Sequence, residues 1–329
     1  MRIEISRENI LKESMDEFKN KIDNGTKNMT IIYKDEIGYD TGGLLKDWFT
    51  VITNDIINLG IFKPVPSGYY YTIDGKNSNE DILHFTGQLI AAALNNNCNL
   101  NLKLVSFIWK ILLNEKITIE DMEEYDDSVY KSLKWMLEND VEGMNEVFVD
   151  SNDVALKKNG RNIRLTNENK NEYVNLMLKR IFIGKNGQLF KLLADGFNET
   201  VDLECVKLYD AKKLREEING QDIIDLVDWK NNTVCKNKDE LDNFFNIIAK
   251  WPNKKLRKLL EFTTGSPLVP IKGFKYLNGG QFNISLCSKH KYPEAHTCIN
   301  QLILPKNNYY YELRDKLLIA IEVNNFGIE

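Results

Sequence analysis

The sequence has few cysteines and histidines for its length, with five cysteines and three histidines among 329 residues. The cysteine count is odd and the spacing is wide, so we do not expect a disulfide framework. Free thiols are typical of a reducing compartment, and we therefore expect the protein in the cytoplasm or the nucleus. The cysteines are Cys98, Cys205, Cys235, Cys287 and Cys298.

Long apolar runs and an excess of basic charge are also missing. No stretch approaches the roughly 20 apolar residues that cross a bilayer. The first residues alternate charged and apolar side chains, which is unlike a secretory signal. The formal net charge is −5, whereas binding to a phosphate backbone needs a surplus of Lys and Arg. We expect neither a membrane nor a nucleic acid among the partners.

The composition that is present is typical of a globular protein, with 43% hydrophobic and 28% charged residues. The length suffices for two domains. The pattern over residues 1–220 predicts mainly helices with short strands. One helix is expected after the Gly-rich turn at 42–43 and another over residues 84–97. The first carries an apolar stripe at helical spacing, formed by Leu44, Leu45, Trp48, Phe49 and Ile52.

The sequence pattern over about 115–180 differs from that of the flanking residues. An acidic stretch over 119–127 leads into a strong helix, and a second helix follows Thr166 or Asn167, either of which suits an N-cap. We interpret this segment as a small subdomain inserted into the larger lobe. The first helix places four apolar residues on one face, namely Val129, Leu133, Met136 and Leu137.

The pair Asn219-Gly220 strongly interrupts regular structure, and we place a domain boundary at about residue 220. The pattern beyond it has shorter elements. Helices are expected over 239–250, after Pro252 and near 309–322, and strands over 282–286 and 298–304.

Residues 291–305, KYPEAHTCINQLILP, carry the most informative chemistry. His296 and Cys298 are two residues apart, so on an extended strand their side chains would share a face. A cysteine at the entrance of a strand is held rigidly and remains reachable. The thiolate is its reactive form, and a nearby imidazole or backbone N–H favours reaction.

Three interpretations of Cys298 compete on spacing alone. The cysteine could be a small buried apolar residue. It could belong to a zinc site, because four residues of zinc-ligand type occur together: Cys287, His290, His296 and Cys298. It could also be a nucleophile. A hydrolytic triad is poorly supplied by three histidines, one of which, His84, opens a predicted helix. Exchange between thioesters is less demanding and needs no strong base.

The segment resembles the active-site signature of HECT-type ubiquitin ligases, through Pro293, His296-Thr297-Cys298, Asn300 and Leu304-Pro305. Other segments resemble the same family in the expected order. They are DTGGLLKDWF (40–49), HFTGQLIAAAL (84–94), YKSLKWMLEND (130–140), NIRLTNENKNEYV (162–174), DGFNE (195–199) and LLEFTTGSPLVPIKGF (259–274). The resemblance covers essentially the whole chain.

The resemblance implies an α+β fold of two lobes and no cofactor or metal. The large, mainly helical N-lobe would span 1–220 and carry the small subdomain at about 115–180, which docks a ubiquitin-conjugating enzyme. A hinge would lie at 219–222, including Asn219, Gly220 and Gln221. The smaller α/β C-lobe would span 223–329. This division agrees with the boundary drawn from the residues.

The resemblance also implies a two-step reaction and its site residues. Ubiquitin passes from the conjugating enzyme to Cys298 as a thioester, and then to a lysine of a protein substrate. His296 polarises the thioester or shapes the loop, and Thr297 is a further residue of the signature. Phe326, fourth from the end of the chain, stands where the family carries a functionally important phenylalanine, which the resemblance places between the lobes during transfer.

The resemblance further suggests a docking surface and acidic helpers. Val129, Tyr173 and Met177 match positions that contact the conjugating enzyme, and we expect Tyr173 to be an exposed aromatic; core packing is the alternative. Candidate carboxylates that take the proton of the attacking lysine are Asp121, Glu123, Asp126 and the C-terminal carboxylate. The alternative is a solvated acidic face. The competing function is a catalytically silent module that only docks a conjugating enzyme.

Overall fold

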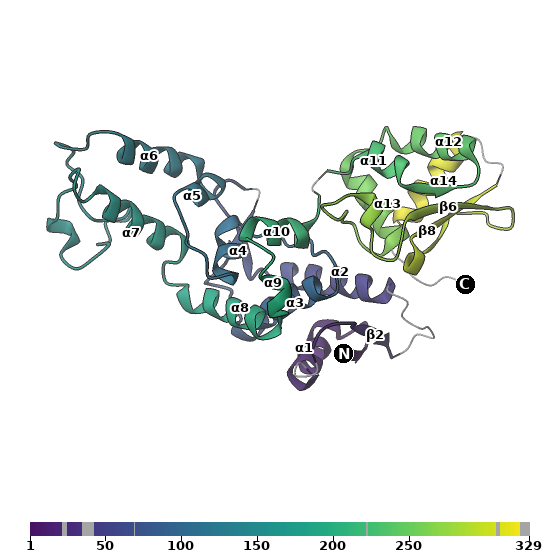
Figure 1. The fold of residues 1–329 in the computed structure, drawn as a ribbon, viewed down its shortest axis with the longest axis horizontal. Coiled ribbons are helices and arrows are strands. Elements are labelled where there is room, and N and C mark those ends of the chain that lie inside the picture. Colours follow the sequence, from purple (N-terminus) through teal and green to yellow (C-terminus); the bar gives the residue numbers. More distant parts are fainter. Residues whose placement is uncertain (22–24, 35–42, 69, 222, 307–309, 323–329) are drawn as a thin grey trace.

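The computed structural model describes residues 1–21, 25–34, 43–68, 70–221, 223–306 and 310–322. Figure 1 shows an elongated molecule. Helices α6 and α7 lie at one end, helices α11 to α14 with strands β6 and β8 lie at the other, and α2, α3, α4 and α10 lie between them. Within the described ranges, no helix is long and apolar enough to span a bilayer.

The first part of the chain is mainly helical. A parallel pair of strands, β1 and β2, and an antiparallel pair, β3 and β4, accompany the helices. The elements are β1 (Arg2–Ile5), α1 (Ile10–Lys21), β2 (Thr30–Tyr33), α2 (Gly43–Asn58), β3 (Phe62–Pro64), β4 (Tyr71–Ile73), α3 (Glu80–Asn95), α4 (Ser106–Leu112), α5 (Glu120–Tyr125), α6 (Asp127–Glu138), η2 (Gly160–Asn162), α7 (Lys170–Phe182), α8 (Gly187–Thr200), α9 (Leu203–Val206) and α10 (Ala211–Asn219).

The second part combines helices with a four-stranded sheet. The strand order is β5-β6-β8-β7, in which β5, β6 and β8 are parallel and β7 is antiparallel to β8. The elements are α11 (Leu226–Asn231), β5 (Thr233–Cys235), α12 (Lys238–Ile248), α13 (Asn253–Thr264), η3 (Phe274–Tyr276), β6 (Phe282–Cys287), β7 (Glu294–His296), η4 (Thr297–Ile299), β8 (Gln301–Pro305) and α14 (Tyr310–Glu322). The expected α+β fold is confirmed.

The buried apolar residues form two clusters, which give each lobe its own core. The first cluster runs from Ile3 to Ile218 and the second from Ile224 to Ile321. The second is centred on Trp229, whose ring stacks on Phe274 at 4.7 Å between centroids. The chain therefore changes from one core to the other in the short segment between Ile218 and Ile224.

Two glycines allow the main helices of the first lobe to cross at close range. A Cβ atom on Gly87 of α3 would lie 2.0 Å from the carbonyl oxygen of Leu193 in α8. A Cβ atom on Gly196 of α8 would lie 2.0 Å from the carbonyl oxygen of His84 in α3. Both distances are far below van der Waals contact with rigid backbone, so only glycine fits at this crossing.

Gly196→Ala is expected to destabilise the first lobe by about 3 kcal/mol, because the added methyl group pushes α3 and α8 apart. The matched control is Gly187→Ala at the start of the same helix, where the nearest atom, Cγ2 of Ile183, lies at an ordinary 3.4 Å. Urea denaturation of both variants measures the difference. Equal stability of the two variants would contradict the crossing argument.

Candidate active site

Cys298 lies on the turn of the hairpin between β7 and β8, within the short 3-10 segment η4. Its side chain is partly exposed. The hairpin is closed by the pairing of His296 with Gln301. The predicted strand over 298–304 is therefore wrong at its beginning, because β8 starts only at Gln301. His296 and Cys298 do not share the face of one strand, since His296 ends β7 and Cys298 lies in the turn.

The backbone of Asn300 explains this difference. Asn300 has φ of 50°, in the left-handed region, and this breaks the extended run between the cysteine and the strand. Its side chain is fully buried. The amide donates to the carbonyl oxygens of Asn278 at 2.9 Å and Gly280 at 2.6 Å. The turn that carries Cys298 is thus fixed from its C-terminal side.

The other two residues of the His-Thr-Cys segment directly precede the cysteine. His296 is exposed and Thr297 is half-buried. The Oγ1 atom of Thr297 lies 2.5 Å from the position of a Cβ atom on Gly43, the first residue of α2, and the backbone nitrogen of Cys298 lies 3.1 Å from the same position. The cysteine turn therefore packs directly on the start of α2 in the first lobe.

The arrangement suits exchange of an acyl group better than hydrolysis. The other two histidines contact carboxylates of their own, His84 with Glu199 at 3.0 Å and His290 with Glu294. His290 is also one of the four residues considered above as zinc ligands. In the described part of the chain, however, no three His, Cys, Asp or Glu side chains lie close enough together to hold a metal ion. The site therefore consists of the partly exposed thiol of Cys298, on a hydrogen-bonded turn, and the imidazole of His296 two residues before it.

The expected docking residues lie on the helices of the small subdomain. Val129 of α6 and Met177 of α7 are half-buried. Tyr173 is only 5% exposed, and its ring meets the edge of Phe148 at 5.4 Å between centroids. The expectation of an exposed aromatic at Tyr173 is wrong, because the ring packs against Phe148 in the core of the lobe. The exposed aromatic of this region is Trp135 on α6, at 49%.

The expected acidic helpers have local structural partners. Asp121 is 5% exposed and accepts hydrogen bonds from Nζ of Lys110 at 2.7 Å and the backbone N–H of Thr118 at 2.8 Å. Asp126 caps α6, and Glu123 is exposed. Helix α5 and the start of α6 lie away from the lobe that carries β8 (Figure 1). This arrangement of the lobes does not bring these carboxylates to Cys298. Their role as acceptors of the lysine proton stays a prediction.

The connection between the lobes is bonded to the second lobe. Asn219 ends α10, and Gly220 follows with φ of 65°. A Cβ atom on Gly220 would lie 2.2 Å from the carbonyl oxygen of Val269, which accepts the backbone N–H of Gln221 at 2.8 Å. The glycine is needed here both for its conformation and for the close approach. Phe326, the C-terminal carboxylate and residue 222 lie outside the described residues.

Three residues of the site were not recognised as such from the sequence. Gly43 belongs to a Gly-Gly pair, a motif that by itself predicts a turn and no contact with the cysteine. Lys46 of α2 donates across the lobes to Oδ1 of Asn300 at 3.1 Å. Asn300 is part of the signature, but its left-handed backbone and buried amide are not visible in the sequence. Their partners are more than 200 residues away in sequence or depend on backbone conformation, so spacing alone gave no signal for them.

The fold and the site together define a two-lobed protein with a partly exposed cysteine, Cys298, on a structured turn. The family model described as HECT-domain (ubiquitin-transferase) matches residues 50–329, and the chain belongs to this family.

Relatives of named function are similar over nearly the whole chain. It is 31% identical to E3 ubiquitin-protein ligase RSP5 of Saccharomyces cerevisiae over 99% of this chain and 44% of the relative. It is 33% identical to E3 ubiquitin-protein ligase TOM1-like of Neurospora crassa over 98% of this chain and 8% of the relative. It is 31% identical to E3 ubiquitin-protein ligase pub1 of Schizosaccharomyces pombe over 99% of this chain and 46% of the relative. The chain thus spans less than half the length of these relatives.

Proposed function

We propose that the chain is a ubiquitin-ligase catalytic domain, which accepts ubiquitin from a conjugating enzyme on Cys298 and transfers it to a lysine of a protein substrate. The observation that carries the proposal is the position of Cys298, partly exposed on a turn fixed by Asn300 in a chain of the HECT family. The relatives' printed names support the same activity.

The first step is an exchange of thioesters. The Sγ thiolate of Cys298 attacks the carbonyl carbon of the ubiquitin thioester on the conjugating enzyme. A new C–S bond forms, the old C–S bond breaks, and the conjugating enzyme's cysteine leaves as thiolate. One thioester replaces another, so the step needs little driving force and no strong base.

The second step forms an amide. The neutral ε-amine of a substrate lysine attacks the same carbonyl carbon, a C–N bond forms, and the C–S bond to Cys298 breaks with the thiolate as leaving group. The amine's proton passes to a base, for which a carboxylate is suitable. A substrate lysine can approach the turn from solvent, because His296 and Ile299, on either side of Cys298, are exposed.

The two steps need different partners at different ends of the molecule, which supports a division of labour between lobes. We assign residues 1–220 to the N-lobe, 219–222 to a hinge and 223–329 to the catalytic C-lobe, in line with the two separate cores. The subdomain at about 115–180 would dock the conjugating enzyme through Val129 and Met177, beside the exposed Trp135. A free thiol at Cys298 requires a reducing compartment, so we place the protein in the cytoplasm or nucleus.

The test is conjugate formation with purified components. The chain is incubated with ubiquitin, ATP, an activating enzyme and each of several conjugating enzymes, and conjugates are followed on reducing gels. The proposal expects conjugates that resist reduction and depend on both the chain and a conjugating enzyme. Binding of a conjugating enzyme without any conjugates would instead indicate a silent docking module.

Phe326→Ala is expected to leave loading of Cys298 largely intact and to slow the transfer to lysine about tenfold, because the resemblance places this side chain between the lobes in the second step. Ile328→Ala, two residues further on, is the control. Pulse-chase measurement separates the two steps, with loading followed first and discharge to free lysine second. An equal loss in both steps would contradict this role.

A further inference from the structure

Helix α2 of the N-lobe meets the C-lobe along one face. Gly43, Lys46 and Thr50 follow each other at intervals of three and four residues, so they line one side of the helix. Gly43 lies against the cysteine turn, and Oγ1 of Thr50 donates to the carbonyl oxygen of Gly265 at 3.2 Å. Lys46 stands between these two contacts. Its position puts a charged group in the middle of the interface between the lobes.

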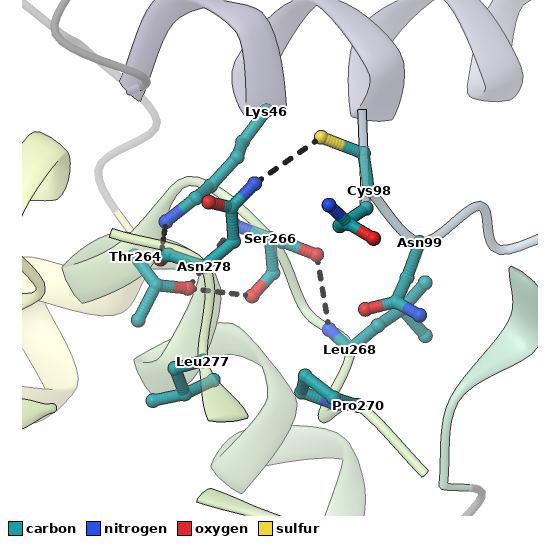
Figure 2. A pocket seen from close by; sticks show the side chains of 10 residues that line it. Lys46, Cys98, Asn99, Thr264, Ser266, Leu268, Pro270, Leu277 and Asn278 are labelled. Atoms are coloured by element: carbon teal, nitrogen blue, oxygen red, sulfur yellow. Dashed lines mark hydrogen bonds between the residues drawn. The ribbon is translucent and has the colours of Figure 1, made fainter. Parts of the chain in front are cut away.

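The Lys46 ammonium is held by two acceptors of the C-lobe. It donates to Oδ1 of Asn300 at 3.1 Å and to the carbonyl oxygen of Asn278, a contact that Figure 2 shows. The amide of Asn300 donates to the same Asn278 oxygen at 2.9 Å. The three groups form a closed set, and one member, Asn300, is the residue that ends the cysteine turn. Lys46 therefore contacts the support of Cys298, not an unrelated surface.

The ammonium also lies close to the backbone of the cysteine turn. A Cβ atom on Gly279 would lie 2.8 Å from the carbonyl oxygen of Cys298 and 3.1 Å from Nζ of Lys46. A side chain at Gly279 would therefore crowd both the lysine and the cysteine turn. This places the positive charge of Lys46 near the cysteine without contact to the reacting atoms.

Lys46 is deeply buried for a charged side chain, with 6% exposure. Burial lowers its pKa to about 8, although nearby Cys98 and Cys298 act in the opposite direction. A buried ammonium is tolerated only where acceptors replace its water. The two acceptors come from the C-lobe, so Lys46 is satisfied in this way when the lobes are arranged as seen here.

The arrangement seen here holds the cysteine away from the docking subdomain. Helices α6 and α7 lie at the far end of the molecule from the C-lobe (Figure 1). The cysteine turn instead contacts the start of α2, at Gly43. A conjugating enzyme on α6 and α7 would load Cys298 in a different arrangement of the lobes. The contacts of Lys46 thus belong to a state outside the loading step.

We propose that Lys46 is a positioning residue for the second half-reaction, which clamps the loaded cysteine turn onto α2 through Asn278 and Asn300 while a lysine attacks the thioester. The inference rests on the proposed function. Lys46 does not touch the reacting atoms; it limits the motion of the turn relative to the N-lobe. An unclamped turn samples many orientations, so attack by the substrate lysine becomes less frequent.

The experiment measures the two half-reactions separately for Lys46→Met. Methionine keeps the length and bulk of the side chain and removes its charge and its donors. Loading of Cys298 by the conjugating enzyme is expected to stay within about twofold of wild type, while discharge to a protein substrate falls about tenfold, since two hydrogen bonds to a charged donor are lost. Lys46→Arg restores the donors and is expected to recover more than half of the lost rate.

The matched control is Lys63→Met, the same chemical change at an exposed lysine of β3 in the N-lobe. It is expected to load and discharge like wild type. Circular dichroism checks that each variant is folded. Discharge by Lys46→Met at the wild-type rate would overturn the proposal, and so would equal losses in both half-reactions. A wild-type chain that never acquires a thioester would refute the proposed function and is distinguishable from these outcomes.

Gly43→Ala decides the matter if Lys46→Met fails to fold. Gly43 opens α2, where alanine is compatible with the helix, and the collision of the added methyl group is with Thr297 and Cys298 of the C-lobe. The variant therefore disturbs the packing of the cysteine turn on α2 at Gly43 and leaves the Lys46 side chain unchanged. Slow discharge with normal loading would support the clamp, and wild-type discharge would overturn it.

Discussion

Replacing Cys298 with alanine is expected to stop the proposed conjugate formation, with a fall in rate of more than about 1000-fold. Alanine removes the only atom that can hold ubiquitin between the two half-reactions in the proposed mechanism. The hairpin itself should stay folded, because the Cys298 side chain is partly exposed and the turn is held by Asn300. The measurement is the initial rate of conjugate formation at saturating conjugating enzyme.

Cys287→Ala is the matched control for this prediction. Cys287 is half-buried at the far end of the β6–β8 pair, opposite Pro305, whereas the turn adjoins the end where Asn283 pairs with Gln301. Its loss is expected to leave the rate within about twofold of wild type, as for a mild core substitution. A Cys298→Ala variant that still forms conjugates would mean that ubiquitin passes directly from the conjugating enzyme to lysine.

Asn300→Ala is expected to destabilise the C-lobe by about 3–5 kcal/mol and to abolish loading of Cys298 at 37 °C. The side chain is fully buried and donates to two backbone carbonyl groups, of Asn278 and Gly280. Both carbonyl oxygens would lose this donor, and the buried ammonium of Lys46 would lose Oδ1 of Asn300 as an acceptor. Alanine also fits the left-handed backbone at this position less well than asparagine.

Asn28→Ala separates the backbone cost from the hydrogen bonds. Asn28 has nearly the same backbone angle, φ of 54° against 50°, but its side chain is exposed. Its loss should therefore cost only about 1 kcal/mol. Urea unfolding followed by tryptophan fluorescence compares the two variants, because Trp48 lies in the core of the N-lobe, which contains Asn28, and Trp229 in the core of the C-lobe. If both variants lose equal stability, the hydrogen bonds of Asn300 contribute nothing to the turn.

The sequence predicted the fold well where local signals or the family resemblance determined it. The α+β class and the family are confirmed. The strand predicted over 282–286 is found as Phe282–Cys287. The break in the pattern at Asn219-Gly220 lies at the point where one core gives way to the next. These features depend on apolar periodicity and on glycine, which are visible along a single chain.

The parts that the sequence did not predict depend on conformation or on distant contacts. The left-handed backbone of Asn300 turns a predicted strand start into a 3-10 turn at Cys298. Tyr173 is buried because its ring packs against Phe148, from a loop without periodic signal. Lys46 contacts a residue 254 positions away. Neither spacing nor composition predicts these three features, because each depends on the folded backbone or on contacts between residues far apart in the sequence.

The most direct test of the account is the mass of the intact chain after a short incubation with a charged conjugating enzyme, measured without reductant. We expect an adduct of one ubiquitin that disappears on treatment with thiol and maps by peptide analysis to Cys298. A chain that stays unmodified with every conjugating enzyme tried, or an adduct that maps to another cysteine, would contradict it.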